Sequence, residues 1–272
     1  MRRPIRTIAV FPTLLTLGNL ICGFFAIVVA ARIERPDALA ADIDMVDTTN
    51  VMLSGWLIFL AMVFDALDGY VARLSRTATD FGAELDSLSD VISFGVAPAF
   101  LLVKMCPRFA VIHNQAVWII AAAFAACAAL RLARFNVETE KDDEHLYFSG
   151  LPSPAAAAVV AGFAIMFYSL RKDPNWLKQT VDATLQIALP VFGLFVALLM
   201  VSRIRYPHIT NRMLRGQRSF GHVVGVLFFF VAIMVIRGYA VPLAASAFVL
   251  YGPIRLAWDR WVRRRRREEP FF

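Results

Sequence analysis

Several apolar stretches, each about 20 residues long, constrain the fold of this chain more than any other feature. Hydrophobic residues occupy 59% of its 272 positions, whereas roughly half is usual in soluble domains. A helix of about 20 apolar residues crosses a bilayer, and only helices or closed barrels satisfy the backbone there. The sequence therefore predicts an all-α fold, a polytopic bundle of membrane helices.

Eight apolar segments are candidates for membrane spans. They cover residues 9–31, 51–72, 86–105, 116–135, 153–171, 184–202, 222–236 and 239–257. The last two are short and are separated only by Arg237 and Gly238, so they are either two spans or one hairpin that does not fully cross. Pro98 lies inside the third segment and predicts a kink, because proline lacks the N–H that a continuous helix needs.

The distribution of positive charge predicts the orientation of these segments. With the N-terminus inside, 20 of the 28 Lys and Arg residues fall on the inner side and eight on the outer side. Cytoplasmic loops of membrane proteins carry such an excess. We therefore expect both termini in the cytoplasm of a cell with a bacterial-type inner or cell membrane. The arginines at 263–267 are expected to contact anionic lipid headgroups rather than nucleic acid.

Four aspartates lie in or beside the second and third segments, where lipid disfavours charge. Residues three or four apart share a helix face, so the aspartates form two stripes with small residues. The stripes are Asp65, Asp68, Gly69 and Ala72, and then Gly82, Asp86 and Asp90. A carboxylate at the bilayer centre costs roughly 3 kcal/mol on insertion scales, so such groups usually face a cavity, a partner or a cation. The predicted topology brings both stripes to the cytoplasmic face.

This aspartate cluster predicts a metal site. Close carboxylates repel unless cations or protons offset them, and hard divalent cations prefer oxygen ligands. We expect one or two Mg²⁺ or Mn²⁺ ions there, with a diphosphate as the guest, because paired ions can clamp a phosphate. Arg73 follows the first stripe and is placed to pair with phosphate oxygens. The alternative is that the acids are interfacial charges paired with Arg73 and Arg76.

The two stripes together resemble the signature of the CDP-alcohol phosphotransferases. The matching residues are Asp65-Ala-Leu-Asp68-Gly69-Tyr-Val-Ala72-Arg73, eight further residues, and Gly82-Ala-Glu-Leu-Asp86-Ser-Leu-Ser-Asp90. The resemblance implies transfer of a phosphatidyl or similar group from a CDP-linked lipid to an alcohol, with release of CMP. It implies that Asp65, Asp68, Asp86 and Asp90 bind the metal ions, and that Asp90 also takes the proton of the acceptor. It further implies a six-helix catalytic core and a homodimer.

Three flanking segments resemble the membrane-integral phosphatidylserine synthases within this family. They are Pro12-Thr-Leu-Leu-Thr16-Leu-Gly-Asn19 with Gly23, Arg131-Leu-Ala-Arg134-Phe-Asn136, and Phe148-Ser-Gly150-Leu-Pro152-Ser153-Pro154. This resemblance implies CDP-diacylglycerol as the donor and L-serine as the acceptor. The metal signature itself does not separate serine from glycerol 3-phosphate, inositol phosphate or choline. A cation transporter is the alternative from a different class, although the acids lie at one membrane face rather than at the midplane.

Polar and small residues near the cytoplasmic ends of the spans are candidates for substrate contacts. Those for CDP-lipid binding are Thr16, Asn19, Gly69, Ala72, Arg73 and Gly82, and those for serine or phosphate binding are Arg131, Arg134, Asn136 and Ser153. Thr16 and Asn19 share a helix face, so hydrogen bonding between helices is an equal alternative for them. The alternative for Arg131 and Arg134 is anchoring of a helix end by the positive-inside effect.

The chain is expected to divide into three parts. Residues 1–205 form the predicted CDP-alcohol phosphotransferase core, which contains the first six spans. Residues 206–258 form an additional helical hairpin. Residues 259–272 form a basic cytoplasmic tail.

Overall fold

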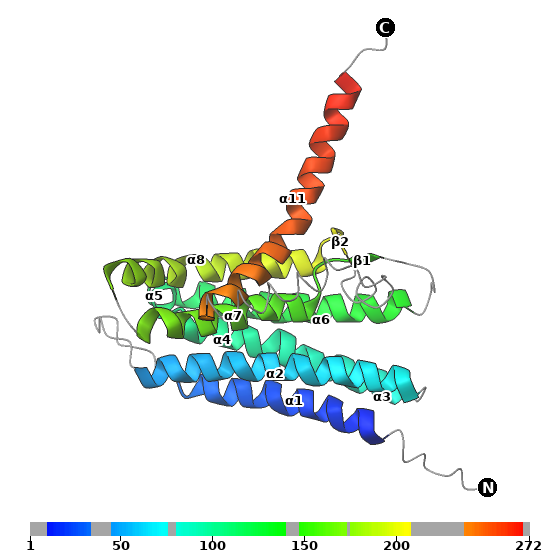
Figure 1. Cartoon of the computed structure of the whole chain (residues 1–272), viewed down its shortest axis with the longest axis horizontal. Coiled ribbons are helices and arrows are strands. Elements are labelled where there is room, and N and C mark those ends of the chain that lie inside the picture. Colours follow the sequence, from blue (N-terminus) through cyan, green and yellow to red (C-terminus); the bar gives the residue numbers. More distant parts are fainter. Residues whose placement is uncertain are drawn as a thin grey trace, which may run out of the picture.

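The computed structural model is a bundle of long helices and confirms the predicted fold class (Figure 1). It describes residues 10–33, 45–75, 80–139, 147–172, 175–207 and 237–268. The elements are α1 (Val10–Ala31), α2 (Met45–Ser75), α3 (Asp80–Asp90), the π-helical η2 (Val91–Val96), α4 (Ala97–Met105), α5 (Pro107–Ile112), α6 (Asn114–Thr139), β1 (Tyr147–Ser149), α7 (Ser153–Lys172), α8 (Trp176–Val201), β2 (Arg205–Pro207), η3 (Arg237–Tyr239) and α11 (Ala240–Glu268).

Seven helical stretches of the described residues are long and apolar enough to cross a bilayer. They are Thr13–Ala31, Met45–Val71, Phe81–Met105, Asn114–Val137, Ser153–Lys172, Trp176–Val201 and Ala240–Trp258. Each corresponds to one of the eight predicted segments, and the protein is therefore an integral membrane protein. The remaining predicted segment, 222–236, lies outside the described residues.

The third span begins earlier than predicted and changes its helical register part-way. It starts in α3, at Phe81 rather than residue 86, so Asp86 and Asp90 both lie on helix rather than at its start. The π-helical η2 follows Asp90 directly, and the Ala97 N–H donates to the Ile92 carbonyl across five residues. Pro98 comes next, in the first turn of α4. The interruption therefore lies just before the proline that predicted a kink.

Small residues let the helices pack closely around α2 and α7. At Gly55 of α2, a Cβ would stand only 2.8 Å from the Ala161 carbonyl oxygen of α7. On the other side of α2, the Ser54 hydroxyl donates to the Ala26 carbonyl of α1 at 2.9 Å. Membrane helices commonly associate through such small residues and polar contacts. These contacts join α1 and α7 to α2 at Ser54 and Gly55, ten or more residues before Asp65 in the sequence.

A short antiparallel strand pair adds to the helical fold. Tyr147 pairs with Pro207, and Ser149 pairs with Arg205. The Gly150 N–H donates to the Ile204 carbonyl at 2.9 Å, and the Leu151 N–H donates to the Leu199 carbonyl at 3.0 Å. These bonds hold the start of α7 against the end of α8.

Replacing Gly150 by Ala is expected to lower stability by about 1–3 kcal/mol, which thermal unfolding in detergent would measure. The φ angle of Gly150 is +93°, a region that side chains disfavour, and an added Cβ would lie 2.3 Å from the Met200 carbonyl oxygen. Gly69→Ala is the matched control, since a Cβ there meets nothing within 4 Å in the described part of the chain. Equal melting temperatures for the two variants would contradict the expectation.

The last helix, α11, is attached to the strand pair through Tyr206. The Tyr206 hydroxyl donates to the Val249 carbonyl at 3.0 Å, and its ring lies against Gly252, where a Cβ would stand 2.5 Å from the ring. Burial raises the pKa of Tyr206 to about 12, so the hydroxyl keeps its proton at neutral pH. Beyond this contact α11 leaves the bundle and extends away from it (Figure 1). It is one helix through Glu268, across the predicted boundary between residues 258 and 259.

Candidate active site

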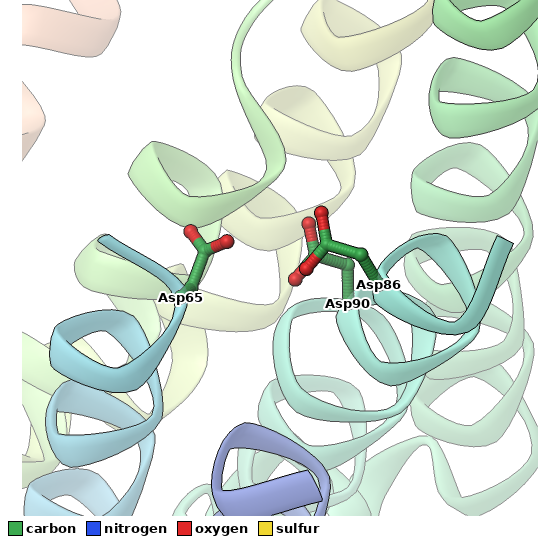
Figure 2. Close-up of side chains that lie close together, drawn as sticks. All are labelled: Asp65, Asp86 and Asp90. Carbon is green, nitrogen blue, oxygen red and sulfur yellow. The ribbon is translucent and has the colours of Figure 1, made fainter. Parts of the chain in front are cut away.

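Three of the four aspartates converge from two helices. Asp65 projects from α2 toward Asp86 and Asp90, which lie one turn apart on α3 (Figure 2). One carboxylate oxygen from each lies within 4.8 Å of those of the other two. Asp90 is buried, and Asp65 and Asp86 are half-buried. The spacing of the acids on their helices therefore produces the cluster that the sequence predicts.

Asp68, the fourth predicted ligand, stands apart from this group of three. It is buried on the next turn of α2 and accepts a hydrogen bond from the Thr16 hydroxyl of α1. Its charge still acts on Asp65 and Asp86. Asp68 thus belongs to the same acidic site, although its oxygens do not join the closest set.

Helix α1 reaches both pairs of acids. Thr16 and Asn19 are buried, as expected for residues that face a neighbouring helix. Thr16 bonds to Asp68, and the Asn19 side-chain N–H donates to the Asp90 Oδ1 at 3.0 Å. Of the two alternatives for these residues, hydrogen bonding between helices is what the structure contains, and the groups they contact are the predicted metal ligands.

Arg131 of α6 is a basic residue that acts on the acidic cluster. Its Nη1 donates to the Ser153 hydroxyl at 2.7 Å, which joins α6 to the first residue of α7. The guanidinium also interacts electrostatically with Asp65 and Asp90. Two of the four residues predicted to bind serine or phosphate therefore lie together beside the acidic cluster.

The other two residues of that set hold elements together instead. The Arg134 Nη2 donates to the Val201 carbonyl at 2.6 Å, at the end of α8. The Asn136 side-chain N–H donates to the Ser87 hydroxyl of α3 at 2.9 Å. Val201 has its last-turn carbonyl satisfied in this way, which is a usual role for a basic side chain at a helix end.

Small residues of the predicted donor site leave open space. Among the described residues, a Cβ at Gly69 would meet nothing within 4 Å, and Gly82 is half-buried on α3. Ala72 and Arg73 continue α2, but their side-chain contacts lie outside the described residues.

The residues present fit a divalent cation. Among the described residues, Asp86 Oδ1 and Asn19 Oδ1 are buried oxygens without a hydrogen-bond partner. Leaving a buried acceptor unsatisfied costs roughly 1–3 kcal/mol, so such atoms usually have a ligand or ion. A set of carboxylate and amide oxygens is the chemistry that Mg²⁺ and Mn²⁺ prefer. The acidic cluster could therefore hold a metal.

The sequence did not predict Ser93 or an apolar groove lined by residues of α2, α7 and α11. Ser93 is buried in η2 and donates to the Asn19 carbonyl at 2.9 Å. Its position three residues after Asp90, on the same helix face, is the signal that could have identified it.

The groove has a volume of about 480 Å³ and is lined by Trp56, Phe59, Met62, Val63, Ala66, Leu67, Ile165 and Val241. In the sequence these residues do not differ from ordinary apolar span residues.

The sequence model of the CDP-alcohol phosphatidyltransferase family matches residues 9–204 of this chain. The chain belongs to that family. The matched region contains all four aspartates and Arg131 with Ser153, so the acidic cluster lies inside the family domain.

Three relatives indicate where the chain lies within the family. A CDP-diacylglycerol–serine O-phosphatidyltransferase of Methanocaldococcus jannaschii is 42% identical over 157 residues, which cover 58% of this chain and 65% of that protein. An enzyme of the same name from Helicobacter pylori is 30% identical over 254 residues, 93% of each chain. An archaetidylserine synthase of Methanothermobacter thermautotrophicus is 38% identical over 156 residues, 56% of this chain and 57% of that one.

Proposed function

We propose that this protein transfers the phosphatidyl group of CDP-diacylglycerol to L-serine, giving phosphatidylserine and CMP. The observation that carries the proposal is the convergence of Asp65, Asp86 and Asp90 from α2 and α3, within 4.8 Å of one another. Relatives named for this reaction support the choice of donor and acceptor.

The apolar groove supports a diacyl lipid as the donor. Its lining on α2 runs from Leu67 and Ala66, which follow Asp65 in the sequence, to Trp56. A helix rises about 1.5 Å per residue, so this lining extends about 15 Å along α2. The lipid chains would lie in this groove, while the diphosphate reaches the acidic cluster.

Asp65, Asp68, Asp86 and Asp90 would hold Mg²⁺ or Mn²⁺, and we propose two ions. Divalent cations bound there would supply stabilisation of the charge that develops on the diphosphate. Gly69, Ala72, Arg73 and Gly82 would surround the nucleotide and its phosphates. Open space at Gly69 supports this assignment.

Asp90 would act as the base for the acceptor. It takes the proton of the serine hydroxyl, and the freed oxygen bonds to the phosphorus that carries diacylglycerol. The bond from that phosphorus to the bridging oxygen breaks, and CMP leaves with the electron pair. We propose a direct displacement, because no Cys or His of the described residues joins this acidic group to serve as a nucleophile.

We propose that Arg131 binds the serine carboxylate, and Ser153 orients its guanidinium. Arg131→Gln is expected to raise the KM for serine by about tenfold or more, because a charge-assisted hydrogen bond is lost. Arg134→Gln is the matched control on the same helix. Its side chain bonds the Val201 carbonyl, so we expect a lower melting temperature with little change in this KM. If Arg131→Gln instead raised only the KM for CDP-diacylglycerol, Arg131 would bind the lipid phosphate.

The remaining proposals concern the orientation in the membrane, the oligomeric state and the division of the chain. We propose that both termini and the acidic site face the cytoplasm and that the protein is a homodimer in the membrane. We retain the division into a core at 1–205, an additional helical part at 206–258 and a basic segment at 259–272. The arginine-rich end of α11 would contact anionic membrane lipid rather than nucleic acid.

The test is a CMP-release assay with purified protein in vesicles that contain CDP-diacylglycerol. Serine is expected to support metal-dependent release of CMP and formation of phosphatidylserine. Glycerol 3-phosphate, inositol phosphate and choline are expected to remain near the rate without acceptor. Faster release with one of these would assign another acceptor to the same site, and no release with any of them would refute transferase activity.

A further inference from the structure

Asn19 contributes a buried amide to the acidic cluster. It is fully buried in α1, and its Nδ2 donates to Asp90 Oδ1 at 3.0 Å, across 71 positions of the sequence. We propose that Asn19 is a positioning residue, which fixes the carboxylate of Asp90 for its work on the acceptor. The inference rests on the function proposed above and gives Asn19 a role other than contact with the nucleotide.

The backbone around Asn19 is held against the helix that carries Asp90. The buried Ser93 hydroxyl, in η2, donates to the Asn19 carbonyl at 2.9 Å. One turn along α1, a Cβ at Gly23 would stand 2.7 Å from Ser93 Cα and 2.3 Å from its hydroxyl oxygen. Only glycine permits this approach, so the distance between α1 and η2 is set by direct contact. These two contacts between α1 and η2 position the Asn19 amide against Asp90.

The hydrogen bond from Asn19 gives the two carboxylate oxygens of Asp90 different roles. Oδ1 accepts the amide N–H, which leaves Oδ2 for a proton or a cation. A hydrogen bond to a carboxylate in a site that excludes water is stronger than one between neutral groups. It limits rotation of the carboxylate, and small misplacements of a catalytic group lower rates strongly.

Thr16 provides a parallel case in the other pair of acids. It lies three residues before Asn19 on the same face of α1, and its hydroxyl donates to Asp68. Helix α1 therefore holds one carboxylate of α2 and one of α3. This pairing explains why polar side chains are buried at both positions in an otherwise apolar span.

The experiment compares Asn19→Leu with wild type and with Ser54→Ala, using the full chain in vesicles. Ser54→Ala is the matched control, because it removes another buried hydrogen bond of α1, to Ala26, away from the acids. The readouts are Mn²⁺ affinity by paramagnetic resonance without lipid substrate, and kcat with KM for CDP-diacylglycerol. We expect Asn19→Leu to weaken Mn²⁺ binding and to lower kcat about 10–100-fold, with a KM within about twofold of wild type. We expect Ser54→Ala to match wild type in all three.

Three further variants keep the proposal testable if Asn19→Leu does not fold. Thr16→Val removes the hydroxyl that holds Asp68, and Thr16→Ser restores it, so only the first is expected to weaken Mn²⁺ binding. Asn19→Ser is smaller and polar but too short to keep the bond, and is expected to behave as Asn19→Leu does.

Three results would decide against the inference or separate it from the proposed function. Unchanged Mn²⁺ affinity and kcat, with a raised KM for CDP-diacylglycerol, would make Asn19 a nucleotide contact and overturn the inference. Equal values for the Asn19 variants and Ser54→Ala would reduce Asn19 to packing, which also overturns it. The third result is that the wild-type protein releases no CMP with serine while Asn19→Leu still loses Mn²⁺ binding. That result would support the positioning of Asp90 by Asn19, and the proposed function would fail.

Discussion

Replacing Asp90 by Asn is expected to lower the rate of CMP release by about 10²–10⁴-fold, the range typical for loss of a general base. The amide keeps the size of the side chain but cannot accept the proton of the serine hydroxyl. It also replaces one of the three carboxylates whose oxygens lie within 4.8 Å of one another by a neutral amide. Turnover of the purified variant in vesicles, at saturating CDP-diacylglycerol and serine, measures the effect.

The matched control for this variant is Glu84→Gln. Glu84 is an exposed acid on the same helix, α3, and the substitution is again an isosteric change from acid to amide. Its turnover is expected to equal that of wild type. If Asp90→Asn retained a rate close to that of Glu84→Gln, the assignment of Asp90 as the base would be wrong.

Removal of divalent cations is expected to reduce CMP release to the rate without protein, and added Mg²⁺ or Mn²⁺ is expected to restore it. The reason is electrostatic: Asp65, Asp86 and Asp90 bring three carboxylates together, and a diphosphate adds further negative charge. Without cations, these groups repel the donor. The assay is chelation of the purified protein, followed by stepwise addition of each metal.

Asp86→Asn connects this result to the site. Asp86 Oδ1 is buried without a hydrogen-bond partner among the described residues, and we propose a cation as its partner. We expect the variant to need at least about tenfold more metal for half-maximal activity. We also expect Mn²⁺ to raise its melting temperature less than that of wild type, because a ligand stabilises the fold in proportion to its binding. Metal dependence identical to wild type would exclude Asp86 as a ligand.

The membrane fold could be predicted from the sequence because its main signal is local. A run of about 20 apolar residues identifies a span without knowledge of its neighbours. The strand pair β1–β2 could not be predicted, since Tyr147–Ser149 and Arg205–Pro207 are short and pair across more than 50 residues. Gly150 directly follows β1, so its positive φ could not be predicted from the sequence either.

The acidic cluster could be predicted because periodicity on a helix places side chains on one face. Asp86 and Asp90 are four residues apart on α3, and Asp65 lies ten residues before the end of α2, which α3 follows in the sequence at Asp80. The separate position of Asp68 was not predictable, because it depends on its bond to Thr16 in another helix.

The roles of the flanking polar residues depend on tertiary contacts. Arg131 and Arg134 have the same residue type and almost the same position on α6. Arg131 lies beside the acids and bonds Ser153, whereas Arg134 bonds the end of α8. Spacing along one helix predicts the face on which a side chain lies, but not the group of a neighbouring helix that it contacts.

The most direct test of the central claim is anomalous X-ray scattering from crystals of the full chain grown with Mn²⁺ and CDP-diacylglycerol. The account predicts manganese peaks between α2 and α3, bounded by Asp65, Asp86 and Asp90, with the diphosphate of the lipid against them. Manganese found only elsewhere, or a diphosphate bound away from these three carboxylates under conditions that support turnover, would contradict it.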